Sequence, residues 1–342
     1  MKHNKTTCIF GGLLLLLLVA FGVNLSLGSV PIPIEDIFSS LFAGQTDRES
    51  WQYIIWNYRL PKALTAILIG GGLSLSGLLM QTLFRNPLAG PFVLGVSSGA
   101  SLGAALLIMG VSLLGGLGAG YLTSDLSLIV ASGLGSFRVL VIVLVVATRL
   151  NDAMAQLIVG LMFGSITAAL VTVLSYFSQA EQLQKYIFWS YGSIGNLSWS
   201  QVGLLTVFVL SGIGISIGLM KALNAFLLGE NYAVSMGIST KRSRNWIILA
   251  TGLLAGGITA FAGPIAFIGL AVPHLARQLL GTQDHRVLLP GVLLYGGILM
   301  LVCDVIAQLP FSAYVLPINA ITSLVGAPVV IWLLLRRNRI LF

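Results

Sequence analysis

The sequence predicts an all-α polytopic membrane protein, because charged residues are scarce and long apolar stretches recur along the chain. Lys and Arg number 18 and Asp and Glu 10 among 342 residues. Hydrophobic residues make up 57% and the mean hydropathy is +0.98, whereas a soluble domain carries about 25% charged residues. We therefore expect one transmembrane domain over residues 1–342.

Runs of roughly 17 to 25 apolar residues, each long enough to cross a bilayer core, predict ten transmembrane helices. They cover about 9–27, 61–83, 88–110, 126–148, 154–177, 200–220, 245–262, 265–281, 287–308 and 312–335. The first run follows a basic start, as in a secretory signal, but no convincing cleavage pattern of small residues comes after it. We interpret it as a retained helix.

The stretch 245–281 is ambiguous, since it fits either one long segment or a hairpin of two short helices turning near Gly263 and Pro264. Cytoplasmic loops carry an excess of Lys and Arg. The hairpin places Arg277 and Arg286 with most other basic residues on one side, and a single crossing would not. The charge pattern favours the hairpin and predicts a multi-pass protein with both termini in the cytoplasm.

Several functional classes are excluded by the residues that carry chemistry. The net charge of +8 reflects the inner loops, and no basic patch interleaved with aromatic residues indicates nucleic-acid binding. Cys8 and Cys303 are far apart, which predicts neither a disulfide framework nor a metal site. No Ser/His/Asp arrangement and no HExxH motif points to a catalytic site. None of the six lysines follows a glycine, so there is no phosphate-cradling GxxxxGK[ST] loop.

The polar stretch 28–60 is predicted to lie on the outer face. Its segment 34–42 is amphipathic, and Trp51, Trp56 and Tyr58 suit a helix at the membrane interface. Arg59 and Lys62 follow where the chain re-enters the membrane, on the side that is otherwise acidic. This cation pair either anchors the chain to lipid headgroups or receives acidic residues of an external partner.

The inner stretch 222–246 is predicted to form two short helical pieces broken at Gly229 and Gly237. Ala233, Val234 and Met236 would then offer a small apolar surface for the groove of a cytoplasmic partner. The alternative is an ordinary connecting loop.

Two ionisable residues are predicted at membrane depth, where charge is costly and therefore marks a candidate site. Asp304 either makes a structural hydrogen bond or contacts substrate. Arg138 either snorkels, pairs with Asp304 or faces a transport pathway, and a structural role is favoured. His274 and His285, near the inner ends of helices, are expected to be structural.

Many ordered motifs resemble the FecCD family of binding-protein-dependent transport permeases, and the resemblance spans nearly the whole chain. They are Arg59-Leu-Pro-Lys62, Gly77, Gln81, Arg85-Asn-Pro-Leu-Ala89, Pro91, Leu94-Gly95, Leu228-Gly-Glu230, Met236-Gly237, Phe267-Ile-Gly-Leu270, Pro273-His274, Arg277, Asp284-His-Arg286, Leu289-Pro290, Asp304 and Gly326-Ala-Pro328.

The resemblance implies a type II ABC importer of a bacterial inner membrane, in which two copies of this ten-helix subunit form the pathway. Two cytoplasmic ATPase subunits would bind ATP and Mg²⁺, so no cofactor is expected on this chain. An extracytoplasmic binding protein would deliver a ferric siderophore, haem or cobalamin, with haem or a siderophore favoured on family prevalence alone.

The family pattern also implies roles for individual residues. Arg59 and Lys62 correspond to positions that meet the binding protein, and Gly229, Glu230, Ala233, Met236 and Gly237 match the segment that docks to the ATPase. Asn86 and Leu88 match positions near the cytoplasmic gate. The family often has a basic residue shortly after the equivalent of Asp304, but this chain has Asp304-Val-Ile-Ala-Gln308, so docking would use fewer charges.

Two other classes remain open from the residues. An ion-coupled secondary transporter would share the hydropathy, although it usually has coupling-ion residues at mid-membrane, and only Arg138 and Asp304 are available. A membrane-embedded enzyme lacks candidate catalytic residues.

Overall fold

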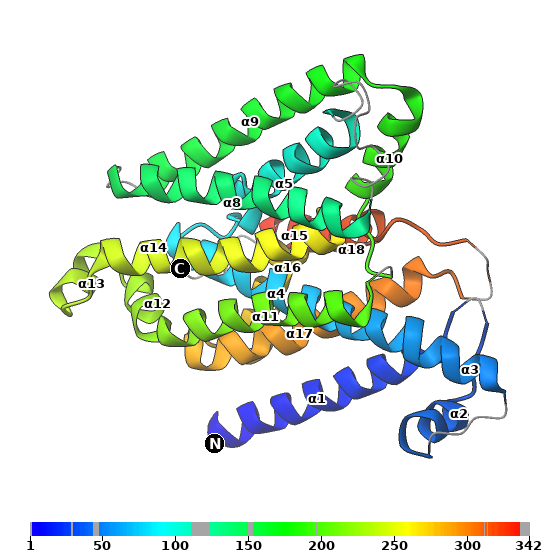
Figure 1. Ribbon diagram of the computed structural model, residues 1–342. Coiled ribbons are helices and arrows are strands. Elements are labelled where there is room, and N and C mark those ends of the chain that lie inside the picture. Colours follow the sequence, from blue (N-terminus) through cyan, green and yellow to red (C-terminus); the bar gives the residue numbers. More distant parts are fainter. Residues whose placement is uncertain are drawn as a thin grey trace.

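The computed structural model describes residues 2–28, 30–43, 48–110, 124–149, 153–195, 197–310, 312 and 314–335. Over this part of the chain the structure contains helices, turns and coil but no strand. The long helices run roughly alongside one another and form a bundle (Figure 1). The all-α fold class is confirmed, although the predicted domain of 1–342 includes residues outside the described ranges.

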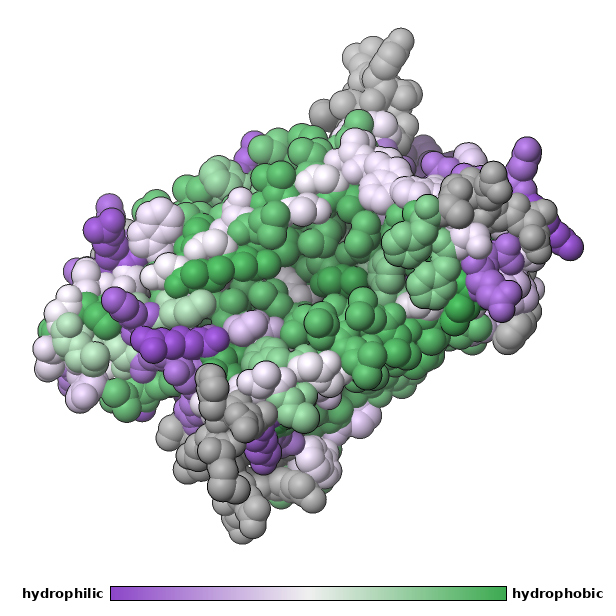
Figure 2. Space-filling view, turned by 90° about the horizontal axis from the view of Figure 1, so that it is seen from below, coloured by the Kyte–Doolittle hydropathy of each residue, from purple (hydrophilic) through white to green (hydrophobic). Residues whose placement is uncertain are grey.

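Seven helical segments are long and apolar enough to cross a membrane: 5–26, 49–83, 125–146, 155–177, 199–218, 240–262 and 285–307. Two shorter apolar helices cover 96–110 and 318–332. Figure 2 shows apolar side chains across the middle of one face and hydrophilic groups toward its two ends, as expected for a membrane protein. The count of ten crossings stays a prediction, because three of the ten predicted segments are shorter helices preceded by irregular chain.

The long helices have these bounds: α1 Lys2–Ser26, α4 Leu60–Leu83, α8 Asp125–Arg149, α9 Ala153–Phe177, α11 Trp199–Gly218, α14 Thr240–Thr251, α17 His285–Ala307 and α18 Ile318–Leu335. The shorter apolar pieces are η3 Pro91–Leu94, α5 Val96–Ala105, η4 Leu106–Gly110, η5 Gly252–Gly256, α15 Gly257–Ala262 and α16 Ile268–Leu280. The polar connections carry α2 Ile34–Phe38, η1 Ser39–Ala43, α3 Glu49–Ile54, η2 Ile55–Arg59, α10 Ala180–Ser190, α12 Met220–Leu227 and α13 Glu230–Ser235.

Helix α4 lies at the centre of the bundle, packed against α17, α16, α11 and α14 (Figure 1). Every residue of α4 from Ile69 to Leu83 is buried. A Cβ at Gly70 would collide with the carbonyl oxygen of Gly296, and one at Gly77 with that of Gly269. Small residues at these crossings allow the helix backbones to touch. The close van der Waals contact between them helps to hold transmembrane helices together in lipid.

The chain reverses between α15 and α16. Helix α15 ends at Ala262, and Gly263 and Phe267 both have positive φ, of 73° and 67°. The Ala262 carbonyl accepts a hydrogen bond from Ser193 before α11, whereas Arg277 on α16 reaches Gln81 near the last turn of α4. The two helices therefore run in opposite directions, and the hairpin predicted from the charge pattern is confirmed.

The bundle has two polar ends. The α13 end carries α12 and α13, and the α10 end carries α2, α3 and α10 at the opposite side of the molecule (Figure 1). The predicted amphipathic segment 34–42 forms α2 and η1, in which Phe38 and Phe42 are exposed and Ile37 is buried. Helix α3 continues through η2 directly into α4.

Candidate functional site

The α13 surface is a small apolar knob between two glycine breaks, as the sequence predicts. Gly229 has φ of 110° and Gly237 has φ of 76°, values that residues with a Cβ rarely adopt. After α13 the Ile238 N–H donates to the Ala233 carbonyl over 3.0 Å, closing the helix end. The knob is bounded on both sides by backbone conformations that only glycine adopts readily.

The exposed members of the α13 surface are Tyr232, Val234 and Met236, each more than half exposed, and Leu228, just before the first break, is also exposed. The predicted exposure of Ala233 is wrong, since it is fully buried and faces the rest of the protein. These exposed side chains do not form one helical stripe, because Leu228 and Met236 flank the six-residue α13 and Tyr232 and Val234 are only two residues apart. A short helix with several exposed apolar side chains is typical of a docking surface.

An ion pair fixes the orientation of α13. The Arg244 Nη2 atom of α14 lies 2.7 Å from Oε1 of Glu230, the first residue of α13. The Arg244 side chain is nearly buried while that of Glu230 is 43% exposed. A carboxylate in the first turn also suits the positive end of the helix. Glu230 therefore holds α13 against α14 in this structure.

A buried polar network connects α12, next to the α13 surface, with α17 and α4. Asn224 Oδ1 on α12 is 2.7 Å from His285 Nδ1, and the other ring nitrogen of His285 is 2.9 Å from Thr82 Oγ1 on α4. Asn224 Nδ2 donates to Asp284 over 2.7 Å. His285 is fully buried, which agrees with the structural role predicted for it. Nothing in the sequence singles out Asn224, because its partners lie about 60 residues away along the chain.

Asp284 caps the N-terminus of α17 at the edge of this network. Its side chain accepts a hydrogen bond from the Arg286 N–H over 3.0 Å. This backbone bond, followed by the bond from Asn224, holds the pKa of the Asp284 carboxyl below its ordinary value. The carboxylate is therefore ionised at neutral pH.

The chain breaks sharply after α4, at the predicted gate. Arg85 has φ of 47°, and Asn86 Oδ1 accepts a hydrogen bond from the Leu88 N–H over 2.9 Å. The His274 ring N–H donates to the Pro87 carbonyl over 2.8 Å. Leu88 is 44% exposed. The Pro87 carbonyl, which the break frees from helical bonding, is thus satisfied by α16, as irregular backbone within a membrane protein requires.

Gln81 joins the last full turn of α4 to α16. Arg277 Nη1 donates to Gln81 Oε1 over 2.7 Å, and Gln81 Nε2 donates to the Leu270 carbonyl over 3.1 Å. Together with the bond from His274 to Pro87, these contacts tie the break to α16 at several points. Helix α12, which leads into α13, packs against α4, so the gate region and the α13 surface lie at the same end of the bundle.

At the α10 end, the two cations predicted to face outward are engaged inside the protein. The Arg59 guanidinium donates to the carbonyls of Leu25, Ser26 and Val30, with the Ser26 bond at 2.8 Å. Arg59 is 9% exposed. It satisfies the Leu25 and Ser26 carbonyls at the end of α1, which lack helical partners, and the Val30 carbonyl in the segment that follows. Its guanidinium is used within the chain in this conformation.

Lys62 forms an ion pair with Asp304, with 3.0 Å between Nζ and Oδ1. The other carboxylate oxygen of Asp304 accepts bonds from Asn24 over 2.8 Å and from Gln308 over 2.7 Å. Asp304 thus makes structural hydrogen bonds, one of the alternatives left open by the sequence, and its ion-pair partner is Lys62 and not Arg138. Arg138 is exposed near the middle of α8.

No group of three or more His, Cys, Asp or Glu side chains that could hold a metal ion is found in the described ranges. Cys8 is exposed and Cys303 buried, and neither forms a disulfide.

Comparisons with known proteins bear on the whole chain. Residues 15–336 match the FecCD transport family. The vitamin B12 import system permease protein BtuC of Salmonella arizonae is 38% identical over 290 residues, covering 84% of this chain and 84% of that protein. BtuC of Citrobacter koseri is 37% identical over 340 residues, covering 99% and 97%.

A solved ABC transporter described as being of the metal-chelate type, in an inward-facing conformation, superposes with a TM-score of 0.84. The two chains are 30% identical, and the match covers 96% of this chain and 99% of the solved one.

Proposed function

The chain belongs to the FecCD transport family, and we propose that it is the membrane-spanning permease subunit of an ABC importer for cobalamin or a ferric chelate. The single observation that carries this proposal is similarity to BtuC permeases over nearly the full chain, at 37% identity. The α13 surface supports it, because a permease without a nucleotide-binding loop needs a place where a separate ATPase docks.

The ATPase is proposed to receive the α13 surface in a groove, as helix-in-groove recognition requires. Tyr232, Val234 and Met236 would enter the groove, while Gly229, Glu230 and Gly237 fix the shape of the segment and Ala233 anchors it from within. ATP and Mg²⁺ would be bound by the ATPase. Two copies of this chain and two ATPase subunits complete the proposed assembly.

Movement of α13 would reach the gate through side chains already in contact. Asn224 connects α12 to His285, and His285 contacts Thr82 on α4, three residues before Arg85. Asn86 and Leu88 lie just beyond this point. The network supports a mechanism in which displacement of α13 shifts the end of α4 and changes access to a pathway between the two copies.

The α10 end is proposed to face the extracytoplasmic binding protein. Arg59 and Lys62 lie on that side, but an acidic residue of the partner would have to compete with Asp304 for Lys62. Such an exchange of ion pairs costs less than leaving the Lys62 ammonium unpaired, because the partner's carboxylate takes the place of Asp304. Ten crossings would then place the α13 end and both termini in the cytoplasm.

The substrate class follows the relatives and departs from the preference based on family prevalence. The BtuC proteins with which this chain shares 38% identity are vitamin B12 permeases, which favours cobalamin over haem or a siderophore. The solved metal-chelate transporter at 30% identity keeps ferric chelates as the second candidate. Arg138, exposed on α8, is a candidate contact for an anionic chelate.

Uptake assays would test the substrate. The permease should be reconstituted into liposomes with its ATPase and binding protein, and supplied in turn with cobalamin, a ferric siderophore and haem. We expect ATP-dependent accumulation of cobalamin first. Uptake of haem alone would overturn the substrate proposal, and uptake that follows an ion gradient without ATP would favour the secondary transporter instead.

A further inference from the structure

A groove outside the proposed transport machinery lies between α8 and α14 near the α13 end. It is an open groove with a volume of about 480 Å³, lined by Leu144, Val145, Arg242, Asn245, Trp246 and Leu249. We propose that this groove binds one phospholipid with an anionic headgroup.

The wall from α14 is amphiphilic along its length. Residues 242, 245, 246 and 249 are spaced by three and four, so they share one face of the helix. Arg242 and Asn245 lie near the start of α14, and Leu249 lies further toward the middle of the bundle. A headgroup would therefore meet polar groups at the α13 end, and an acyl chain would meet apolar ones deeper in the groove.

The wall from α8 is likewise basic at the α13 end and apolar deeper in the groove. Leu144 and Val145 line the groove, and Val145 is 54% exposed. Arg149 lies one turn beyond Val145, is exposed and belongs to the last turn of α8. Because α8 ends and α14 begins at the α13 end (Figure 1), Arg149 and Arg242 lie at the same end of the groove.

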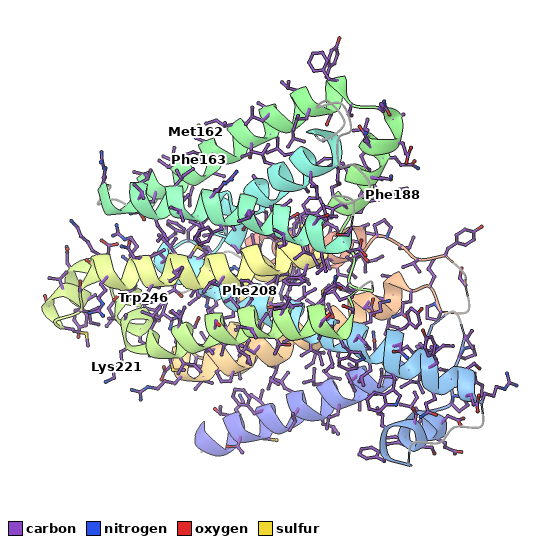
Figure 3. The ribbon with its side chains drawn as sticks, in the orientation of Figure 1. Met162, Phe163, Phe188, Phe208, Lys221 and Trp246 are labelled. Atoms are coloured by element: carbon purple, nitrogen blue, oxygen red, sulfur yellow. The ribbon has the colours of Figure 1, made fainter. Side chains whose placement is uncertain are left out.

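Trp246 places the mouth of the groove at the membrane surface. It lines the groove and is 42% exposed, and Figure 3 shows it on α14 at the end that carries α13, with Lys221 on the same side of the molecule. Tryptophan is enriched where hydrocarbon meets headgroups. The aliphatic part of the groove then lies at acyl-chain depth within the apolar span 125–146 of α8.

The charge of the groove selects the headgroup. Among the residues that the structure describes, the lining contains one cation and no carboxylate, and Arg149 adds a second positive charge. Two described acids of the α13 end are engaged elsewhere, Glu230 with Arg244 and Asp284 with Asn224 and the Arg286 N–H. The start of the 12-residue helix α14 adds a partial positive charge. Basic pockets of this kind between transmembrane helices bind anionic lipid headgroups.

Quenching of Trp246 fluorescence tests the proposal directly. The complete transporter is reconstituted with phospholipids brominated on the acyl chains, either phosphatidylglycerol or phosphatidylcholine at the same mole fraction. The Trp246 component is the difference between the wild type and Trp246→Phe. We expect phosphatidylglycerol to quench it at lower mole fractions than phosphatidylcholine does.

Charge variants assign the site. Arg242→Gln should weaken the relative affinity for phosphatidylglycerol about fivefold, and Arg149→Gln with Arg242→Gln about 25-fold, because each basic residue near the surface contributes about 1 kcal/mol. Arg242→Lys should retain the preference. The matched control is Lys221→Gln, which removes an exposed charge at the same end but outside the groove lining.

Three results would overturn the proposal. They are equal quenching by the two lipids, an equal loss in Lys221→Gln, and a Trp246 component that neither lipid quenches. The third result would show that the ATPase or a second copy of this chain covers the groove.

Discussion

The two ends of the bundle differ in what they do with their functional side chains. At the α13 end, apolar side chains of a six-residue helix are exposed while the polar groups beneath them bond to one another. At the α10 end, the cations expected on the surface are turned inward, Arg59 onto the carbonyls that end α1 and Lys62 onto Asp304. If both ends dock as we propose, the α13 end can do so with side chains that are already exposed, whereas the α10 end must exchange an internal contact for an external one.

Breaking the buried ion pair between Lys62 and Asp304 should give the largest loss of stability. It tests whether the inward contacts hold the α10 end together. Asp304→Ala leaves Lys62 without its carboxylate and also removes the acceptor for Asn24 and Gln308. We expect the free energy of unfolding to fall by about 3 kcal/mol, since breaking a buried pair leaves an uncompensated charge. Denaturation of the purified protein in mild detergent would measure it.

The control for this variant is Glu181→Ala, which breaks the exposed pair between Glu181 and Lys185, 2.8 Å apart at the same end. Surface pairs contribute little, so stability should not change measurably. An equal loss in the two variants would contradict the account. Asp304→Asn adds a sharper test, because it frees Lys62 and should tighten binding-protein docking if the proposed exchange occurs.

The packing of α4, which connects the two ends, should give the next largest effect. Gly77→Ala places a methyl group against the Gly269 carbonyl and should lower the free energy of unfolding by about 2 kcal/mol, as overpacking does. Gly214→Ala in α11, where no atom lies within 4 Å of the new Cβ, is the matched control and should be neutral or stabilising. A neutral Gly77→Ala would show that the helices do not touch there.

The exposed α13 surface is tested by adding charge to it. Met236→Asp should weaken association with the ATPase about tenfold, because desolvating the new carboxylate costs more than 1 kcal/mol and tenfold corresponds to about 1.4 kcal/mol. Association can be measured by co-purification and titration. Tyr314→Asp, at an 80% exposed position outside α13, should leave association unchanged, and equal losses would remove the special role of α13.

The cap of α17 should give the smallest effect, with a defined pH dependence. Asp284→Ala should lower the free energy of unfolding by about 1 kcal/mol. Because the folded-state pKa of Asp284 is lowered, its contribution is complete above the unfolded pKa of about 3.9 and disappears as the pH falls through the lower folded value. The wild-type advantage over Asp284→Ala should therefore be constant from about pH 7 to pH 5 and shrink only below about pH 4. An advantage that disappears near pH 6 would exclude this origin.

Hydropathy and glycine positions were enough to predict much of the fold. Apolar runs located the helices because the bilayer sets their length, and Gly229 and Gly237 marked the limits of α13 because only glycine readily takes their φ. The inward direction of Ala233 could not be predicted, since a helix of six residues has too few turns to show a periodicity.

The partners of the polar residues required the tertiary structure. Asn24 meets Asp304 across 280 residues of chain, and Thr82 meets His285 across 203. No local pattern encodes such contacts. The sequence therefore singled out Arg59 and Lys62 as candidate docking residues. It could not show that both are engaged inside the protein.

Reconstituted uptake with and without the ATPase subunit tests the central claim most directly. Liposomes that contain the permease, the binding protein and the ATPase should accumulate cobalamin or a ferric chelate when ATP is supplied, and Met236→Asp should reduce that uptake. Accumulation by the permease without the ATPase, driven by an ion gradient, would contradict the account.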